Sequence, residues 1–162
     1  MSKVTVDKIQ KIIQLLRAEH SNIHGSKEQQ WIQEHITDQQ LKKIVLNLSI
    51  VSFHILSVLE NGELTGIEIA EKLSVTRGGI TRAAKKLLQY QLITAKKHTD
   101  NQKKLYYSLT DQGRAVALVH DEMHRTIKKQ IVAKLVTKYS DQELQVVADF
   151  LTDLYEFEKE FS

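Results

Sequence analysis

Residues 64–113 contain two short helical patterns followed by two β-prone runs, and this order constrains the fold more than any other feature of the chain. The sequence Thr65-Gly66-Ile67-Glu68 is a capping box, which predicts the start of a short helix. The residues expected on the buried side of this helix are Ile67, Ala70 and Leu73. After a turn at residues 74–75, Thr76 is a suitable N-cap for a second helix. The segment therefore begins as two short helices joined by a tight turn.

The second helix and the two β-prone runs complete this segment. The apolar residues expected on the inner side of the helix are Ile80, Ala84, Leu87 and Leu88. Leu92–Lys96 and Lys104–Leu109 are β-prone, and turn-forming residues 99–102 separate them, which predicts a hairpin. Two helices joined by a turn and followed by a hairpin are the elements of a winged helix-turn-helix, whose second helix enters the DNA major groove.

The remainder of the chain is predicted to be helical, because its 162 residues include no proline and only six glycines. An apolar stripe from Val4 to about His24 predicts a first helix that ends at Gly25. A capping-box pattern at residues 37–40 opens the next helix, which either continues or breaks near Asn47. The fold class is therefore mostly α, with a small β-hairpin.

Two long helices are predicted after the hairpin. Thr110 caps the first, which is expected to reach about Tyr139, and a capping box at residues 140–143 opens the second. The long helices at both ends of the chain carry more apolar surface than a small head covers, so they are expected to pack against a second copy in a symmetric homodimer. The predicted segments are N-terminal dimerisation helices at residues 1–47, a winged helix-turn-helix DNA-binding domain at 48–113 and C-terminal dimerisation helices at 114–162.

Positive charge is concentrated in the second helix and the hairpin. Residues 76–106 carry eight Lys or Arg and one acidic residue, Asp100, for a net charge of +7, whereas the whole chain carries only +3. Double-stranded DNA is the partner that such a concentration favours, and a dimer of such heads prefers a pseudo-palindromic operator. The residues predicted to contact DNA are Ser74, Thr76, Arg77, Gly78, Gly79, Thr81, Arg82, Lys85, Lys86, Lys103 and Lys104.

Composition argues against several other classes of protein. No apolar run approaches the roughly 20 residues that a membrane helix needs, and residues 1–4 lack a signal-peptide pattern, so we expect a cytoplasmic protein without a membrane partner. The chain has no cysteine, which excludes disulfides, thiolate metal sites and peroxide sensing through a sulfenic acid. Any metal ion must therefore be held by His, Asp or Glu.

Four stretches of this sequence resemble the MarR family of winged-helix bacterial regulators, in order and over nearly the whole chain. They are Leu64-Thr65-x-x-Glu68-Ile69-Ala70-x-x-Leu73, Val75-Thr76-Arg77-x-x-Ile80-Thr81, Leu88-x-x-x-x-Ile93 and Ser108-Leu109-Thr110-Asp111-Gln112-Gly113. In that family the motif at residues 109–113 closes the hairpin and opens the long dimerisation helix. The resemblance implies a sequence-specific transcriptional repressor whose DNA binding responds to a small ligand, and not an enzyme.

The tip of the hairpin departs from the family pattern. The family usually has Asp-x-Arg there, with the Arg in the minor groove, whereas this chain has Asn101-Gln102-Lys103. Lys103 keeps the charge but lacks the planar fork of Arg, which is favoured in narrow minor grooves. We therefore expect minor-groove recognition that is weaker or less dependent on A·T content.

Four of the seven histidines form two His-x-x-x-His pairs on predicted helices: His20 with His24, and His120 with His124. Residues four apart on a helix lie on one face, which is a common way to give zinc two nitrogen ligands. The alternative is that the His120 pair faces solvent and His54 is an ordinary core histidine. The two remaining histidines, His35 and His98, are expected at the surface.

The resemblance extends to the zinc-sensing members of the family, the AdcR/ZitR-like repressors of zinc uptake. It implies that His54, His120 and His124 occupy three of their ligand positions. Ligands on the first helix, the second helix and the long helix would tie the head to the dimerisation arm, so that zinc favours the DNA-bound state by an allosteric coupling. Zinc is therefore the predicted ligand.

Two other ligand positions of those repressors are altered in this chain. Their fourth ligand is a Glu of the first helix, where the nearest aligned residue is Ser21, so His20, His24 or Glu19 is expected to substitute. Their second metal site uses a cysteine and a Glu, whose place is taken by Phe53. We therefore expect the second site to be missing.

Three other functions are compatible with parts of the sequence. A regulator of the same family that binds an aromatic or phenolic ligand would line its pocket with residues such as Trp31, Phe53, Tyr106 and Tyr107. A zinc hydrolase is suggested by His120-Asp121-Glu122-Met123-His124, but Asp is too short for the general base and the basic head would have no role. A winged helix that binds proteins is the third, and a flat salt dependence of DNA affinity would favour it.

Overall fold

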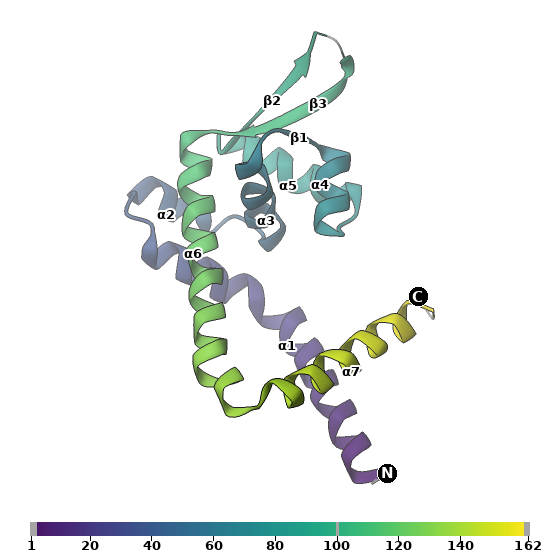
Figure 1. Ribbon diagram of the computed structural model, residues 1–162. Coiled ribbons are helices and arrows are strands. Elements are labelled where there is room, and N and C mark those ends of the chain that lie inside the picture. The colour runs from purple at the N-terminus through teal and green to yellow at the C-terminus, as the bar shows by residue number, and fades with distance from the viewer. Residues whose placement is uncertain (1–2, 100, 161–162) are drawn as a thin grey trace. The chain divides into compact units, whose positions relative to one another are not determined.

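A computed structural model describes residues 3–99 and 101–160 of the chain, without the side chains of residues 3–4, 17–26 and 101. The elements (Figure 1) are α1 (Lys3–His35), α2 (Gln39–Val45), α3 (Ile50–Val58), the 3-10 turn η1 (Leu59–Asn61), β1 (Leu64–Thr65), α4 (Gly66–Leu73), α5 (Arg77–Gln89), β2 (Ile93–His98), β3 (Asn101–Leu109), α6 (Asp111–Lys134), the 3-10 turn η2 (Val136–Lys138) and α7 (Asp141–Lys159). Two units, Met1–Met123 and His124–Ser162, are described separately because each makes most of its contacts within itself. The boundary between them falls inside α6.

The first helix is longer than the sequence predicts, and its expected end at Gly25 is wrong. Helix α1 continues to His35. A single glycine inside a helix costs only about 1 kcal/mol relative to alanine. Burial of Glu28 and Ile32 in the last turns fixes this half of the helix in the fold. The polar segment after Gly25 is therefore part of α1.

The next two helices are separated by a break, which is one of the two possibilities that the sequence leaves open. Helix α2 is capped by Asp38, whose carboxylate accepts hydrogen bonds from the backbone N–H groups of Gln40 and Leu41, rather than by the expected Thr37. Helix α3 starts after Ser49, whose hydroxyl accepts a hydrogen bond from the N–H of Ser52. The break places α3 in the core as a separate helix.

The predicted helix-turn-helix is present as α4 and α5. The capping box at Thr65 is confirmed, because the Thr65 N–H and hydroxyl both donate to the Glu68 carboxylate at 2.7 Å. These hydrogen bonds hold the pKa of Glu68 below its ordinary value. Thr76 caps α5 as predicted, by accepting a hydrogen bond from the N–H of Gly79. The expectation that Ile67 is buried is wrong, since its side chain is 46% exposed and Ile69 takes its place in the core.

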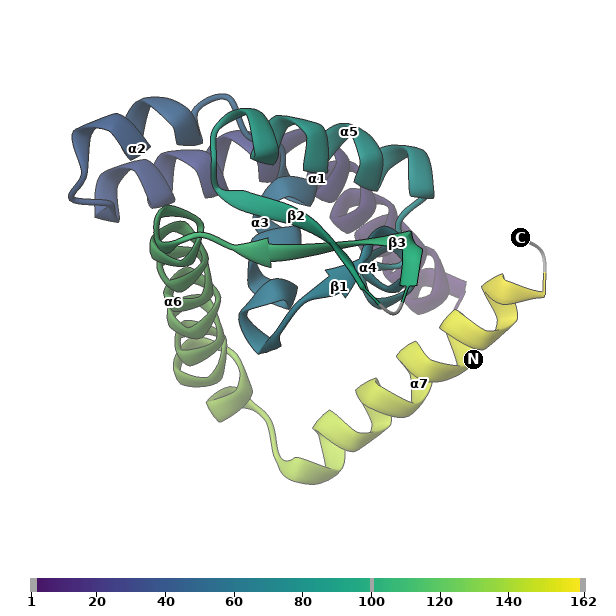
Figure 2. The ribbon, with the colours of Figure 1, turned by 90° about the horizontal axis from the view of Figure 1, so that it is seen from above.

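Three antiparallel strands lie in the order β1-β3-β2, and β3 is seen between the other two in Figure 2. Strands β2 and β3 form the predicted hairpin, which we call the wing, with Ile93 opposite Leu109 and Ala95 opposite Tyr107. The wing is longer than predicted on both strands, because pairing continues to His98 opposite Asn101. Only residues 99 and 100 therefore separate the two strands. The predicted strands, residues 92–96 and 104–109, ended too far from the tip of the hairpin.

The base of the wing is tied to the start of α6. The Thr110 hydroxyl donates to the Gln91 carbonyl at 2.7 Å and accepts from the N–H of Gly113 at 3.1 Å. A Cβ atom at Gly113 would lie 1.8 Å from the Leu92 carbonyl oxygen. This close approach explains why Thr110 and Gly113 occur together at the exit of the wing.

A single core unites the elements of the first unit, from α1 to the first half of α6. Phe53, Leu56 and Leu87 are fully buried in it, and Ile32 of α1 and Val116 of α6 close it. Helices α1, α3 and α6 thus reach one core, and polar residues on their inner faces are brought close together.

The second unit contains the end of α6, η2 and α7. Helix α6 ends at Lys134, which is earlier than the predicted Tyr139, and the capping box at Ser140 is confirmed by hydrogen bonds with Glu143. Large apolar side chains of this unit that are exposed on the single chain include Ile131, Leu135, Val147, Phe150, Leu151, Tyr155 and Phe157. Among the residues described, there is no helix with the length and apolarity needed to cross a membrane.

Candidate metal centre and nucleic-acid interface

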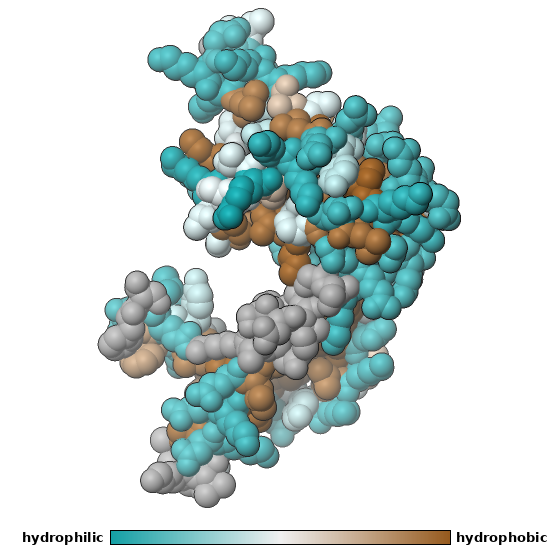
Figure 3. Space-filling model, turned by 180° about the vertical axis from the view of Figure 1, so that it is seen from behind, coloured by the Kyte–Doolittle hydropathy of each residue, from teal (hydrophilic) through white to brown (hydrophobic). Residues whose placement is uncertain are grey.

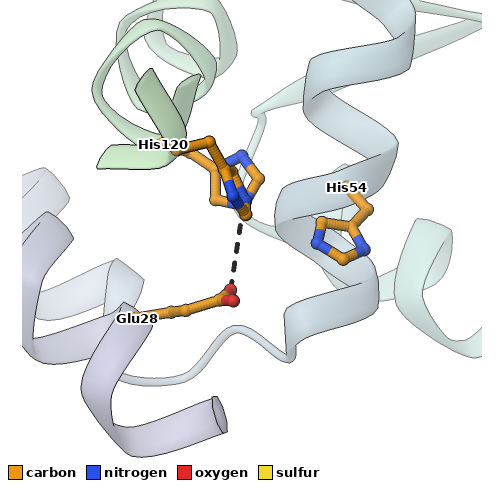
Figure 4. Close-up of side chains that lie close together, drawn as sticks. Glu28, His54 and His120 are labelled. Atoms are coloured by element: carbon orange, nitrogen blue, oxygen red, sulfur yellow. Dashed lines mark ion pairs between the residues drawn. The ribbon is translucent and has the colours of Figure 1, made fainter. Parts of the chain in front are cut away.

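Three helices of the first unit bring together one carboxylate and two imidazoles. Glu28 comes from α1, His54 from α3 and His120 from α6 (Figure 4). Each side chain offers a ligand atom, and these atoms lie within 4.8 Å of one another. The rings of His54 and His120 have their centroids 5.3 Å apart. The three residues therefore form one compact donor set, although they are widely separated in the sequence.

His124 belongs to the same group of potential ligands. It follows His120 by one turn of the continuous helix α6, and residues at this spacing lie on the same helix face. His124 is exposed, whereas the side chain of His120 is buried. Glu28 therefore offers one oxygen donor, and His54, His120 and His124 offer three nitrogen donors.

Two members of this cluster, Glu28 and His120, are buried, so a charge on either of them needs a partner nearby. Glu28 is 8% exposed and His120 is 1% exposed, and Oε2 of Glu28 lies 3.7 Å from Nε2 of His120. A carboxylate oxygen and the unprotonated nitrogen of a neutral imidazole are both acceptors, so a proton on this nitrogen or a cation is needed between them. Carboxylate and imidazole are also donors that zinc prefers, and four of them match its usual coordination number. The residues present therefore fit a zinc ion.

The other side of the His120 ring is held by polar groups. Its Nδ1 lies 2.9 Å from the Ser57 hydroxyl and 3.4 Å from Oδ1 of Asp121, and the Ser57 hydroxyl donates to Oδ1 of Asp121 at 2.6 Å. Partial burial raises the pKa of Asp121, but hydrogen bonds with Ser57 and Glu60 and the nearby His120 outweigh it, so this pKa is lowered. We call Ser57 and Asp121 the ring-holding pair.

The structure brings together only part of the predicted ligand set. His54 and His120 converge, and the interpretation of His120 as a solvent-facing residue is wrong because its side chain is buried. The side chains of His20, His24 and Glu19 lie outside the described residues.

Glu28 is the ligand candidate that the sequence did not identify. It lies beyond Gly25, where the first helix was expected to have ended, in a polar segment without a clear apolar period. The continuous α1 turns its side chain inward beside Ile32, four residues later on the same face. The spacing of Glu28 and Ile32 is the signal that could have found it.

The two remaining described histidines lie elsewhere. His35 is exposed and stacks on Trp31 with a centroid separation of 3.7 Å. His98, in β2, lies 2.7 Å from the Glu63 carboxylate and packs edge-on against Tyr106. His35 is at the surface as expected, whereas His98 is half-buried at the wing.

The residues predicted to contact DNA lie on α5, at its N-terminal turn and on strand β3 of the wing. All of them are exposed except Gly79, which is half-buried. The hydroxyl of Thr76 caps α5 and that of Thr81 donates to the Arg77 carbonyl, so both also stabilise the helix. Figure 3 shows hydrophilic side chains around the tip of the wing at the top of the view.

A groove of about 340 Å³ separates α4 and α5 from the wing. Its lining combines the cations Arg77, Lys103 and Lys104 and one carboxylate, that of Glu68, with apolar Ile80 and Leu105. Both faces of the groove thus present positive charge, one from the helix that starts at Arg77 and one from β3. This arrangement is suited to a polyanion.

The four aromatic residues considered for an alternative ligand pocket have different surroundings. Phe53 is buried in the core, Trp31 stacks on His35, Tyr106 contacts His98, and Tyr107 lines the groove beside the wing. They do not gather around one of the cavities described here.

Comparisons with known proteins agree with this geometry. The family described as "MarR family" matches residues 48–105. The transcriptional regulator ZitR of Lactococcus lactis subsp. cremoris is 32% identical over 103 residues, which cover 64% of this chain and 70% of ZitR. A crystal structure of ZitR, described as a zinc-responsive MarR family member, aligns with a TM-score of 0.74 at 23% identity over 98% of this chain and 99% of that chain. A ZitR variant in complex with DNA aligns with a TM-score of 0.73 at 26% identity, over 100% of this chain and 99% of that chain.

Proposed function

The chain belongs to the MarR family, and we propose that it is a DNA-binding repressor whose affinity for its operator is modulated by zinc. Its named relatives are transcriptional regulators, so the chain is a regulator and not an enzyme. The hydrolase interpretation of the His120 helix is further weakened because Asp121, its candidate base, is engaged by the Ser57 hydroxyl. The choice of zinc is supported by the donor set and by the zinc-responsive description of ZitR.

The observation that carries the zinc proposal is the convergence of Glu28, His54, His120 and His124. We propose Glu28 as the oxygen ligand, in place of His20, His24 or Glu19. Since the ligands come from α1, α3 and α6, a bound zinc ion would supply a cross-link among these helices. Helix α3 precedes the helix-turn-helix and α6 follows the wing. The helix-turn-helix and the wing, which together form the reading head, therefore lie in the sequence between two helices that carry proposed zinc ligands.

The proposed DNA interface consists of α5 in the major groove and the wing beside it. Arg77 and Arg82 on α5, with Lys103 and Lys104 on β3, are exposed and supply the charge for phosphate or base contacts. The remaining predicted contacts are Ser74, Thr76, Gly78, Gly79, Thr81, Lys85 and Lys86. Such a regulator acts in the cytoplasm, where the bacterial chromosome lies.

The proposed assembly is a homodimer on a pseudo-palindromic operator. The apolar side chains exposed on α6 and α7, such as Leu135 and Phe150, favour burial against a second copy. We propose that residues 1–47 and 114–162 dimerise and that 48–113 read DNA. The aromatic-ligand alternative has less support, because Phe53 and Trp31 already have partners within the fold.

A DNA-affinity measurement with controlled zinc tests the proposal. The probe is a duplex selected by the protein itself from random-sequence DNA, titrated with zinc present and then with chelator. A coupling typical of allosteric proteins predicts that chelation weakens binding by about 5- to 150-fold. Affinity that is unchanged by chelator but altered by aromatic carboxylates would favour the alternative ligand.

A further inference from the structure

The hydrogen bonds around His120 determine which of its ring nitrogens carries a proton. The Ser57 hydroxyl has one hydrogen, and a carboxylate such as that of Asp121 accepts hydrogen bonds. The short 2.6 Å contact therefore uses the hydrogen of Ser57, which donates to Oδ1 of Asp121. The oxygen of Ser57 remains as an acceptor for Nδ1 of His120 at 2.9 Å.

It follows that Nδ1 of His120 is the donor in this contact. A second acceptor, Oδ1 of Asp121, lies 3.4 Å from the same nitrogen and favours the same arrangement. With the proton on Nδ1, a neutral His120 ring has its lone pair on Nε2, which faces the Glu28 carboxylate, so that a cation is needed between these two acceptors.

We infer that Ser57 and Asp121 are positioning residues that keep the His120 proton on Nδ1 and so present Nε2 as the zinc-binding atom. This inference deepens the proposed zinc function and rests on it. The contacting groups come from α3 and α6, so the orientation of the ring depends on the packing of these two helices. Outer groups of this kind typically change metal affinity by about 10- to 100-fold when they are removed.

Helix α3 thus has two functions at the centre. It carries His54, a proposed ligand, and Ser57, which follows by three residues and holds the ring of another ligand. A movement of α3 relative to α6 would disturb both together. The ring-holding pair therefore links the metal centre to the helix from which the reading head begins.

The test uses the full-length chain with three serine variants. Ser57→Ala removes the hydroxyl and Ser57→Thr keeps one. Ser52→Ala is the control, because it removes another hydroxyl of the same helix, one that is buried and forms a hydrogen bond with Ser49. Zinc affinity is measured by competition with a chelator of known affinity. Nitrogen-15 NMR of the zinc-loaded protein reports which His120 nitrogen carries the proton and which one binds the metal.

We expect His120 to carry its proton on Nδ1 in the wild type and in Ser57→Thr, and to lose this preference in Ser57→Ala. Zinc affinity should fall by about 10- to 100-fold in Ser57→Ala only. A wild-type proton on Nε2, or an affinity of Ser57→Ala equal to that of Ser52→Ala, would overturn the inference. Failure of the wild type to bind zinc in the chelator competition would instead overturn the proposed function.

Discussion

Oε2 of Glu28 lies 3.7 Å from Nε2 of His120, so the last turns of α1 are tied to the helix that follows the wing. Both groups are buried, and a proton or a cation is required between them. This pair gives the N-terminal helix a direct connection to the metal centre. Because Glu28 adds a buried carboxylate to the two histidines of α6, it favours a zinc site over an incidental His-x-x-x-His spacing.

Replacement of Glu28 by Gln tests this connection. The amide keeps the size of the side chain but removes its charge, so we expect zinc affinity to fall by at least about 10-fold, as for loss of a group that supports a zinc site. Competition with a chelator measures the change. Glu34→Gln, on an exposed part of the same helix, is the control and should bind zinc like the wild type. Equal affinities of the two variants would remove Glu28 from the ligand set.

The two adjacent glycines of α5 are expected to respond differently to alanine. A Cβ atom at Gly78 meets nothing within 4 Å, whereas at Gly79 it would lie 3.0 Å from Cγ1 of Val75 and 3.3 Å from the capping hydroxyl of Thr76. Gly78→Ala should therefore preserve or raise the melting temperature, since alanine favours a helix over glycine by up to about 1 kcal/mol. The same variant should weaken DNA binding, because its new methyl group points into the space that we assign to DNA.

Gly79→Ala is the matched comparison, and its melting temperature should lie below that of Gly78→Ala because the Val75 or Thr76 side chain must move by a few tenths of an ångström. Thermal unfolding and DNA titration of both variants separate the two effects. A Gly78→Ala protein that binds its selected duplex as tightly as the wild type would show that DNA does not approach this part of α5.

Lys103 on the wing provides a test of minor-groove recognition. Removal of one phosphate contact is expected to lower the slope of log affinity against log salt by about 1, so Lys103→Ala should show this change and Lys43→Ala on α2 should not. Lys103→Arg should bind more tightly to duplexes that are rich in A·T beneath the wing, because Arg is favoured in narrow minor grooves. If Lys103→Ala has the salt slope of the wild type, the wing does not contact DNA through Lys103.

The close packing at Gly113 predicts a strong effect on stability. Gly113→Ala would place a methyl group 1.8 Å from the Leu92 carbonyl oxygen, and the backbone cannot yield as a flexible side chain would. Overpacking of this kind typically costs about 1–3 kcal/mol, and a backbone clash lies at the upper end or beyond it. Denaturant unfolding measures the loss. An unchanged free energy of unfolding would mean that the wing and α6 can separate without cost.

Much of the head could be predicted from local signals. The caps at Thr65, Thr76 and Ser140 and the alternation in β3 are short-range patterns, and the structure confirms the elements that they open. The burial of Ile69 instead of Ile67 was not predictable in this way, because the capping box fixes where α4 starts but not which of its faces meets the core.

The candidate site was predictable only in part. The spacing of His120 and His124 is visible in the sequence, but Glu28 depends on the continuation of α1 through Gly25, which glycine propensity argues against. The roles of Ser57 and Asp121 arise from the packing of α3 on α6, and no sequence period signals such a contact. Long-range polar contacts of this kind are fixed by the tertiary fold.

The most direct test of the central claim is the affinity of the protein for its selected duplex, measured by fluorescence anisotropy with saturating zinc and with chelator. The wild type and His120→Ala, which lacks a buried ligand candidate, are compared under both conditions. We predict that zinc tightens binding by the wild type by about 5- to 150-fold and leaves His120→Ala at its chelated affinity. Equal affinity of the wild type with zinc and with chelator, or the same zinc response in His120→Ala, would contradict regulation through this centre.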